Sequence, residues 1–227
     1  MKKYRTLLLD ADDTIFDFGA CEREALRLAF QKYGYPLDEK ISKLYSDINK
    51  ALWRRFELGE VDRDTVIYSR FGELFQQIGI EDDGIAFEED YQELLGMQGF
   101  LIKEAPELLA YLQGSYALYI VTNGITATQL SRFKESGMDR YVKRIFVSEE
   151  TGYQKPRKEF FDYCFKKIGH IDLSETLIIG DSLSSDILGG NNAGIDTCWY
   201  NPAALPNTLG VRVDYEIRNL KELYHIL

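Results

Sequence analysis

The fold is decided by the stretch Arg5-Thr6-Leu7-Leu8-Leu9-Asp10-Ala11-Asp12-Asp13-Thr14, where an apolar run ends in three carboxylates and a threonine. A short apolar run bounded by turn-type residues is typical of a buried strand in a parallel sheet. Side chains alternate along a strand, so Asp10 and Asp12 can point the same way. Open α/β sheets bind ligands at the carboxyl ends of their strands. We therefore expect a site at the end of this strand.

The crowding of Asp10 and Asp12 has an electrostatic cost. Two carboxylates about 5 Å apart repel each other by roughly 3 kcal/mol at an effective dielectric constant near 20. Either one of them is protonated, or a hard cation lies between them. The alternative is a solvated turn after the strand, because Asp and Thr also favour turns and helix N-caps.

The charge of the chain limits its partners. The 227 residues include 27 Lys and Arg against 37 Asp and Glu, a formal net charge of −10. A polyanion would be repelled by this field, so we expect no nucleic acid and no membrane as partners, although a single phosphate group can still be held locally. No apolar stretch approaches the roughly 20 residues that span a bilayer. With 45 % apolar residues the chain can bury a core of one large or two modest domains.

Cysteine and histidine are few and scattered. Cys21, Cys164 and Cys198 are widely spaced and odd in number, which indicates free thiols in a reducing compartment, so we expect a cytoplasmic protein. His170 and His225 have no ligand-spaced partner, so histidine-based acid–base chemistry and histidine zinc sites are not expected.

From residue 99 onward, short apolar runs alternate with helical patterns. We expect strands at 5–9, 116–121, 144–147, 177–180, 196–200 and 213–217, and helices at 126–136, 156–168, 184–193 and 220–226. Such alternation predicts parallel βαβ units with right-handed crossovers. The predicted fold class is a Rossmann-like α/β core with a parallel sheet flanked by helices, formed by residues 1–16 and 100–227.

The segment 17–99 has a different pattern. Apolar residues recur there at spacings of three and four, and no clear strand is present. Breaks at Gly34-Tyr35-Pro36, Gly59 and Gly79 divide the segment into four helices. We therefore expect an all-helical subdomain inserted after the first strand.

Polar motifs follow four of the predicted strands. They are Asp10-Ala11-Asp12-Asp13-Thr14, Thr122-Asn123-Gly124, Lys155-Pro156, and Gly180-Asp181-Ser182-Leu183-Ser184-Ser185-Asp186. Each motif alone is an ordinary turn or helix start. The four in this order, each near a strand end, form a specific pattern.

This pattern resembles the haloacid dehalogenase superfamily, and within it the phosphatases. In that family Asp-x-Asp-x-Thr is the first motif, a strand-end Thr or Ser the second, a Lys the third, and Gly-Asp-x-x-x-x-Asp the fourth. The resemblance covers the whole chain and implies that the segment 17–99 is a mobile helical cap. One departure is Asp13, where many members have Gly; only the backbone amide is expected to matter there.

The resemblance implies magnesium chemistry at the acidic residues. Mg²⁺ would be held by Asp10, Asp181 and the backbone carbonyl of Asp12, and it would offset the repulsion between an anionic nucleophile and a phosphate ester. Asp10 would attack phosphorus and form an aspartyl-phosphate. Asp12 would be the general acid for the leaving alcohol and then the general base for water.

The remaining motif residues would hold the phosphate. Lys155 and the Thr122 hydroxyl, with amides near Asn123, would bind the oxygens on which charge accumulates. Asp186 would orient Lys155 or a metal-bound water from a position behind the reacting groups.

Asp12 favours a phosphatase over a dehalogenase, because an alkoxide leaving group needs a proton and a halide does not. Residues 9–18 resemble nucleoside 5′-monophosphatases that prefer pyrimidines, so a nucleoside 5′-monophosphate is the expected substrate. A phosphoglycolate or sugar-phosphate phosphatase is the nearest alternative. A receiver-like phosphoacceptor and a non-catalytic binding module remain remote alternatives, and the sequence leaves monomer and homodimer open.

Overall fold

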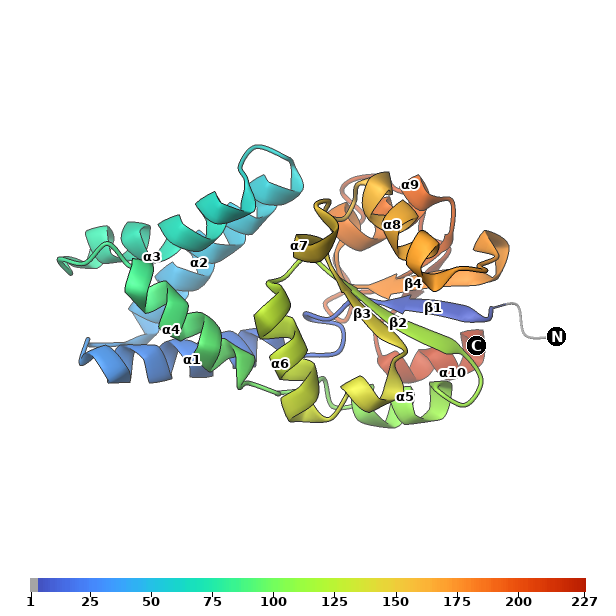
Figure 1. Ribbon diagram of the computed structural model, residues 1–227, viewed down its shortest axis with the longest axis horizontal. Helices are drawn as coiled ribbons and strands as arrows, with labels where there is room; N and C mark the ends of the chain where they lie inside the picture. The colour runs from blue at the N-terminus through green and yellow to red at the C-terminus, as the bar shows by residue number, and fades with distance from the viewer. Residues whose placement is uncertain (1–3) are drawn as a thin grey trace. The chain divides into compact units, whose positions relative to one another are not determined.

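A six-stranded, all-parallel sheet forms the core of one of two compact units in the computed structural model, which describes residues 4–227 (Figure 1). Its strands are β1 (Thr6–Leu9), β2 (Ala117–Thr122), β3 (Arg144–Val147), β4 (Thr176–Gly180), β5 (Asp196–Tyr200) and β6 (Tyr215–Ile217). Their order is β3-β2-β1-β4-β5-β6. The chain adds strands outward from β1 in one direction and then restarts at β4 in the other. The switch point of this doubly wound sheet therefore lies between β1 and β4, where ligands bind in such folds.

Strand β1 is buried on both faces because its leucines alternate between two cores. Leu7 and Leu9 pack into the core that includes residues of α5 (Ala105–Leu112) and α10 (Leu223–Ile226). Leu8 packs into the opposite core. That second core includes residues of α8 (Lys158–Ile168) and α9 (Leu188–Ala193). Figure 1 shows these helix pairs on opposite sides of the sheet.

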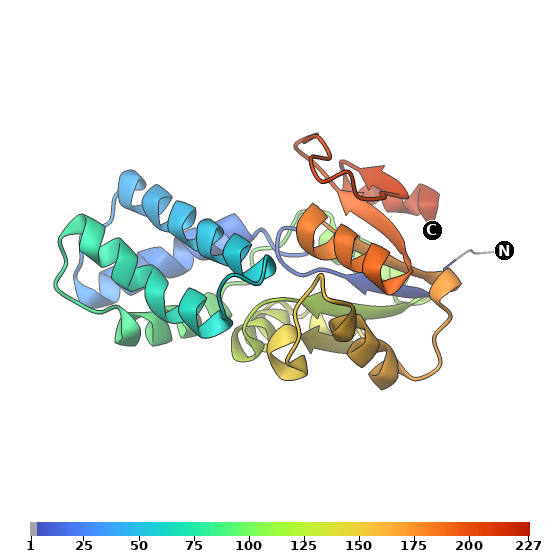
Figure 2. The same cartoon turned by 90° about the horizontal axis from the view of Figure 1, so that it is seen from above.

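The structure divides the chain into two compact units. The first contains the described residues up to Phe18 together with Gly99–Leu227, and the second is Gly19–Gln98. The second unit is built from α1 (Phe18–Tyr33), α2 (Glu39–Glu57), α3 (Arg63–Ile78) and α4 (Ile85–Gly96), as Figure 2 shows. The four helices confirm the periodicity-based prediction.

Local signals fix the ends of the helices in the second unit. Asp38 and Asp62 cap α2 and α3, each accepting a hydrogen bond of 2.8 Å from a backbone N–H three residues on. Gly79 ends α3 in the left-handed conformation, with φ of 76°. The helices bury a cluster of aromatic side chains: Phe30, Tyr45, Phe71, Phe75, Phe87 and Tyr91.

A buried polar network crosses the core of this second unit. The Arg70 guanidinium donates to both carboxylate oxygens of Glu88 at 2.8 and 2.6 Å, and to Asn49 Oδ1 at 2.8 Å. Asn49 in turn donates to Glu22 Oε1 at 2.8 Å. These polar side chains are buried but satisfied, so the network connects four helices at defined positions.

The prediction of a doubly wound α/β sheet is confirmed, with small differences at helix starts. The helix expected at 184–193 begins with a π-helical turn, Leu183–Ile187, before α9. Helix α8 begins at Lys158, two residues later than expected. The helix expected at 220–226 is a 3₁₀ turn, Leu220–Glu222, followed by α10.

The helices α5 and α7 (Ser148–Thr151) were not predicted. Both are short, eight and four residues, so too few apolar repeats are present for periodicity to show. The three cysteines are buried free thiols. Within residues 4–227, no helix has the length and apolar character needed to cross a membrane.

Candidate active site

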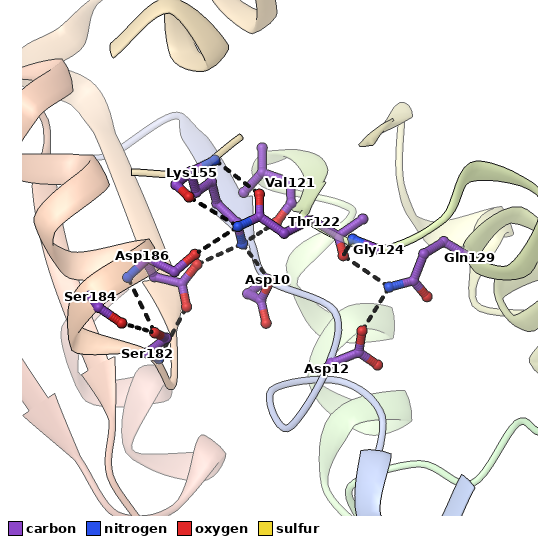
Figure 3. Close-up of polar contacts among 12 residues, drawn as sticks. Asp10, Asp12, Val121, Thr122, Gly124, Gln129, Lys155, Ser182, Ser184 and Asp186 are labelled. Carbon is purple, nitrogen blue, oxygen red and sulfur yellow. Dashed lines mark hydrogen bonds and ion pairs between the residues drawn. The ribbon is translucent and has the colours of Figure 1, made fainter. Parts of the chain in front are cut away.

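Lys155 lies at the centre of the polar residues that follow the strands (Figure 3). Its ammonium group donates to Asp10 Oδ1 at 2.5 Å, to Asp186 Oδ1 at 2.7 Å and to the Val121 carbonyl at 2.7 Å. A lysine ammonium has three hydrogens, and these three contacts use all of them. The side chain of Lys155 is buried, so its position relative to both carboxylates is fixed.

Asn123 holds the backbone of Lys155. The Lys155 N–H donates to Asn123 Oδ1 at 2.9 Å, and Asn123 Nδ2 donates to the Lys155 carbonyl at 3.0 Å and to Ser185 Oγ at 3.3 Å. The turn after β2 thereby sets where Lys155 enters the site. The side chain of Asn123 is committed to this task, which leaves its backbone amide as the group expected to contact a phosphate.

The end of β4 brings two further carboxylates to the site. Asp186 Oδ2 accepts from the Ser182 N–H at 3.1 Å, and its Oδ1 accepts from Lys155. The approach is so close that a Cβ atom on Gly180 would lie 2.2 Å from Asp186 Oδ2. Asp181 is fixed through its backbone carbonyl, which accepts from Trp199 Nε1 at 2.7 Å. The close approach of Asp186 to Gly180 makes glycine a steric requirement of this turn.

Asp10, Asp181 and Asp186 form one acidic cluster. Each contributes one carboxylate oxygen to a group in which all three atoms lie within 4.8 Å of one another. Burial raises the pKa of Asp10 well above its usual value, and the Asp186 carboxylate raises it further against the opposing effect of Lys155. Burial and the carboxylates of Asp10 and Asp186 likewise raise the pKa of Asp181. The cluster is therefore short of positive charge.

The donor set fits a hard divalent cation. Burial acts to lower the pKa of Lys155, but the carboxylates of Asp10 and Asp186 outweigh it and raise this pKa above the usual value. Lys155 thus supplies one positive charge against three carboxylates, which leaves two formal negative charges. Carboxylate oxygens are the ligands that Mg²⁺ prefers. Asp186 has both oxygens engaged by protein donors, so Asp10 and Asp181 are better placed to hold an ion.

The Thr122 hydroxyl is arranged as a hydrogen-bond donor. Its oxygen accepts from Gln129 Nε2 at 2.9 Å and from the Gly124 N–H at 3.3 Å, and the side chain is buried. A hydroxyl accepts with two lone pairs and donates one hydrogen. With both lone pairs occupied, its hydrogen is left for an acceptor such as a phosphate oxygen.

The Asp12 carboxylate is turned toward helix α6 (Thr126–Ser136). Its Oδ2 accepts from Gln129 Nε2 at 2.7 Å (Figure 3), and its Oδ1 accepts from Arg132 Nη1 at 2.5 Å. The Asp12 side chain is 31 % exposed, whereas that of Arg132 is 1 % exposed. Asp13 has a φ of 56°, in the left-handed region, which Asp tolerates and Gly adopts freely.

The structure therefore brings together Asp10, Lys155, Asp181 and Asp186, and holds Thr122 and Asp12 through a shared amide on Gln129. Sequence reasoning missed Gln129, Arg132 and Trp199. The first two are three residues apart on the helix that follows the Thr122 turn, a spacing that places them on one face. Trp199 gave no signal, because its role depends on β5 pairing with β4 in this register.

Comparisons with known proteins identify the family of this chain. The family model for haloacid dehalogenase-like hydrolases matches residues 4–194. The protein YfnB of Bacillus subtilis is 50 % identical over 227 residues, covering 100 % of this chain and 97 % of YfnB. A crystal structure of YfnB bound to magnesium superposes with a TM-score of 0.95, covering 100 % of this chain and 99 % of the other.

Two further relatives have functional names. The pyrimidine 5′-nucleotidase PynA of Streptococcus pneumoniae is 39 % identical, covering 99 % of this chain and 95 % of PynA. The pyrimidine 5′-nucleotidase YjjG of Escherichia coli is 30 % identical, covering 99 % of this chain and 98 % of YjjG. The doubly wound sheet with an acidic cluster at its switch point makes this an α/β protein with a candidate cation site. The chain belongs to the haloacid dehalogenase-like hydrolases.

Proposed function

We propose that this hydrolase is a magnesium-dependent phosphomonoesterase that acts through an aspartyl-phosphate on Asp10. The observation that carries the proposal is the fixed arrangement of the Lys155 ammonium between Asp10 and Asp186, beside Asp181. This arrangement would hold one carboxylate in place as a nucleophile, and the Lys155 charge beside it would offset part of the negative charge of a phosphate ester. YfnB, which shares half of its residues with this chain, has been crystallised with magnesium.

The first step is attack by an Asp10 oxygen on phosphorus. A P–O bond to Asp10 forms and the ester P–O bond breaks, so the alcohol leaves. Lys155 holds the other Asp10 oxygen and thereby orients the carboxylate. Thr122 donates its hydroxyl hydrogen to an equatorial oxygen of the transferring group, where negative charge develops.

Asp12 carries the proton in both half-reactions. It donates a proton to the departing alcohol, then takes one from the water that attacks the aspartyl-phosphate and releases inorganic phosphate. A dehalogenase needs no acid here, so the carboxyl at this position supports ester cleavage. Asp10 and Asp181 would hold Mg²⁺, which supplies charge neutralisation toward the phosphate.

We further propose that the substrate is a nucleoside 5′-monophosphate, with pyrimidines preferred. The support is the naming of PynA and YjjG, which align with 99 % of this chain. The helical segment 17–99 would act as the cap that closes over small substrates and sets their selection.

The first experiment measures phosphate release from p-nitrophenyl phosphate with and without Mg²⁺. We expect Mg²⁺-dependent turnover that Asp10→Asn abolishes, while the exposed acid variant Asp162→Asn retains it. Turnover that survives in Asp10→Asn would overturn the covalent mechanism. Absence of any turnover by the wild type would move the chain to a binding role.

The substrate class is tested by a panel of pyrimidine and purine nucleotides, sugar phosphates and phosphoglycolate at equal concentration. We expect the highest kcat/KM with pyrimidine nucleoside monophosphates. If a sugar phosphate or phosphoglycolate ranks first, the nucleotidase assignment fails and the phosphatase assignment stands.

A further inference from the structure

Two side chains of α6 hold the Asp12 carboxylate, one at each oxygen. Gln129 Nε2 donates to Oδ2 at 2.7 Å and Arg132 Nη1 donates to Oδ1 at 2.5 Å. The two donors are themselves joined, because Arg132 Nη1 also donates to Gln129 Oε1 at 3.0 Å. Both donors are buried, with 2 % of Gln129 and 1 % of Arg132 exposed. The orientation of Asp12 is therefore set from the protein interior.

The same amide reaches the phosphate-binding hydroxyl. Gln129 Nε2 has two hydrogens, and it lies within hydrogen-bond distance of both Asp12 Oδ2 and Thr122 Oγ1, at 2.7 and 2.9 Å (Figure 3). Any shift of Thr122 toward a phosphate acts on the same amide that holds Asp12. One side chain thereby contacts both Thr122 and Asp12.

The residues next to Gln129 and Arg132 leave room for their side chains and pair the charge of Arg132. A Cβ atom on Gly124 would lie 2.6 Å from Gln129 Nε2, so a larger residue there would push the amide away from its partners. The Arg132 guanidinium lies over the Phe16 ring, 4.3 Å from its centre. Burying an arginine is costly unless its charge is paired, and Asp12 is its salt-bridge partner.

We infer that Gln129 and Arg132 are positioning residues that orient the Asp12 carboxyl for proton transfer to the leaving oxygen. This inference rests on the proposed function, in which Asp12 protonates the alcohol as the ester P–O bond breaks. Without these donors the Asp12 side chain populates several rotamers. A smaller fraction of the molecules then has the carboxyl directed at the leaving oxygen. The cost falls on substrates whose leaving group needs a proton.

A pair of aryl esters isolates that cost. Phenyl phosphate and p-nitrophenyl phosphate have similar shape, but phenolate is a much stronger base and depends more on a general acid. The value of kcat/KM reports the first phosphoryl transfer, in which the leaving group departs. The ratio of the two kcat/KM values therefore measures how well Asp12 delivers its proton, whatever the concentration of correctly folded enzyme.

The variants are Arg132→Met and Gln129→Met, with Lys134→Met as the matched control on the exposed face of the same helix. We expect the two buried variants to lose about 10- to 100-fold in kcat/KM on phenyl phosphate and under about threefold on p-nitrophenyl phosphate. Lys134→Met should change neither value. Should Arg132→Met not fold, Gln129→Met carries the same test at a neutral side chain.

Asp12→Asn sets the limit of the effect. Adding Arg132→Met to Asp12→Asn should change the ratio no further, because the donor then has no acid to aim. Equal losses on both esters, or a further change of the ratio in the double variant, would overturn the inference while leaving the phosphatase in place. A wild type without Mg²⁺-dependent turnover of either ester would overturn the proposed function and this inference together.

Discussion

A single glycine connects the backbone of the sheet to the chemistry of the site. Gly180 ends β4, and the Asp186 carboxylate packs directly on its Cα. That contact lets Asp186 accept from the Ser182 N–H with one oxygen and from Lys155 with the other. The position of Lys155 thus depends on the absence of a side chain at Gly180, because a methyl group there would displace Asp186.

We expect Gly180→Ala to lower the activity sharply. The new methyl group would displace Asp186, and Lys155 would lose one of its two anionic partners; the loss of a fixed electrostatic contact of this kind costs about 100-fold in kcat. Kinetics and the thermal midpoint should be measured together. Gly114→Ala is the control, because a Cβ there meets nothing within 4 Å. Activity of Gly180→Ala within about twofold of the wild type would contradict the steric argument.

Three of the predicted site residues have a placement that follows from strand ends, whereas Lys155 and Asp186 were predicted from the resemblance to a known family. Asp10, Thr122 and Asp181 each come directly after or at the end of a recognisable apolar strand, and parallel strands bring these positions to one edge. Gln129 and Arg132 could not be found in this way. Their contact with Asp12 depends on the rotation of α6 about its axis, which packing in the core decides.

At the scale of elements, the helices of Gly19–Gln98 were predictable because their apolar periodicity is long and regular. The buried pair of Arg70 on α3 and Glu88 on α4 was not, since charged side chains normally face solvent and these two lie on the buried faces of their helices. The π-helical turn Leu183–Ile187 was also missed. In this turn the Ser182 N–H donates to the Asp186 side chain, and the helix propensities of single residues do not predict such a contact.

We expect Glu88→Met to destabilise the protein strongly. It removes both oxygens of the carboxylate that pairs with a guanidinium whose side chain is 2 % exposed, and leaving one buried charge unpaired costs about 3–5 kcal/mol. Urea unfolding gives the free energy. The control is Asp47→Asn, which breaks an exposed pair with Lys43 and should cost under about 0.5 kcal/mol.

The double variant Arg70→Met/Glu88→Met separates charge from packing. We expect it to be more stable than Glu88→Met alone, because apolar side chains replace both members of the pair. If the double variant is less stable than the wild type by the sum of the losses of Arg70→Met and Glu88→Met measured singly, the cost lies in the shape of the helix contact and the charge argument fails.

At the scale of the whole molecule, the site exists only because the sheet is complete. Lys155 contacts a carboxylate 145 positions earlier in the chain, and the strands between them set the distance. The unfolded chain holds these acids far apart, so a cation bound by the cluster favours the folded state alone. Metal binding should therefore raise the free energy of unfolding. The rise depends on the free-ion concentration and is about 2.7 kcal/mol when Mg²⁺ is at 100 times its Kd.

The pH dependence of that stabilisation has a definite sign. Burial and neighbouring carboxylates raise the pKa values of Asp10 and Asp181 in the folded, metal-free chain. A carboxyl with a raised folded-state pKa contributes a loss of stability as pH rises from about 4 through that pKa. Mg²⁺ would bind the ionised form and reverse the loss. The Mg²⁺-induced rise in Tm should therefore be small near pH 4 and grow toward pH 8. Asp181→Asn should reduce this rise at every pH. The exposed variant Asp139→Asn is the control and should leave it unchanged. A rise in Tm that is the same at both ends of this range would show that the ion binds elsewhere.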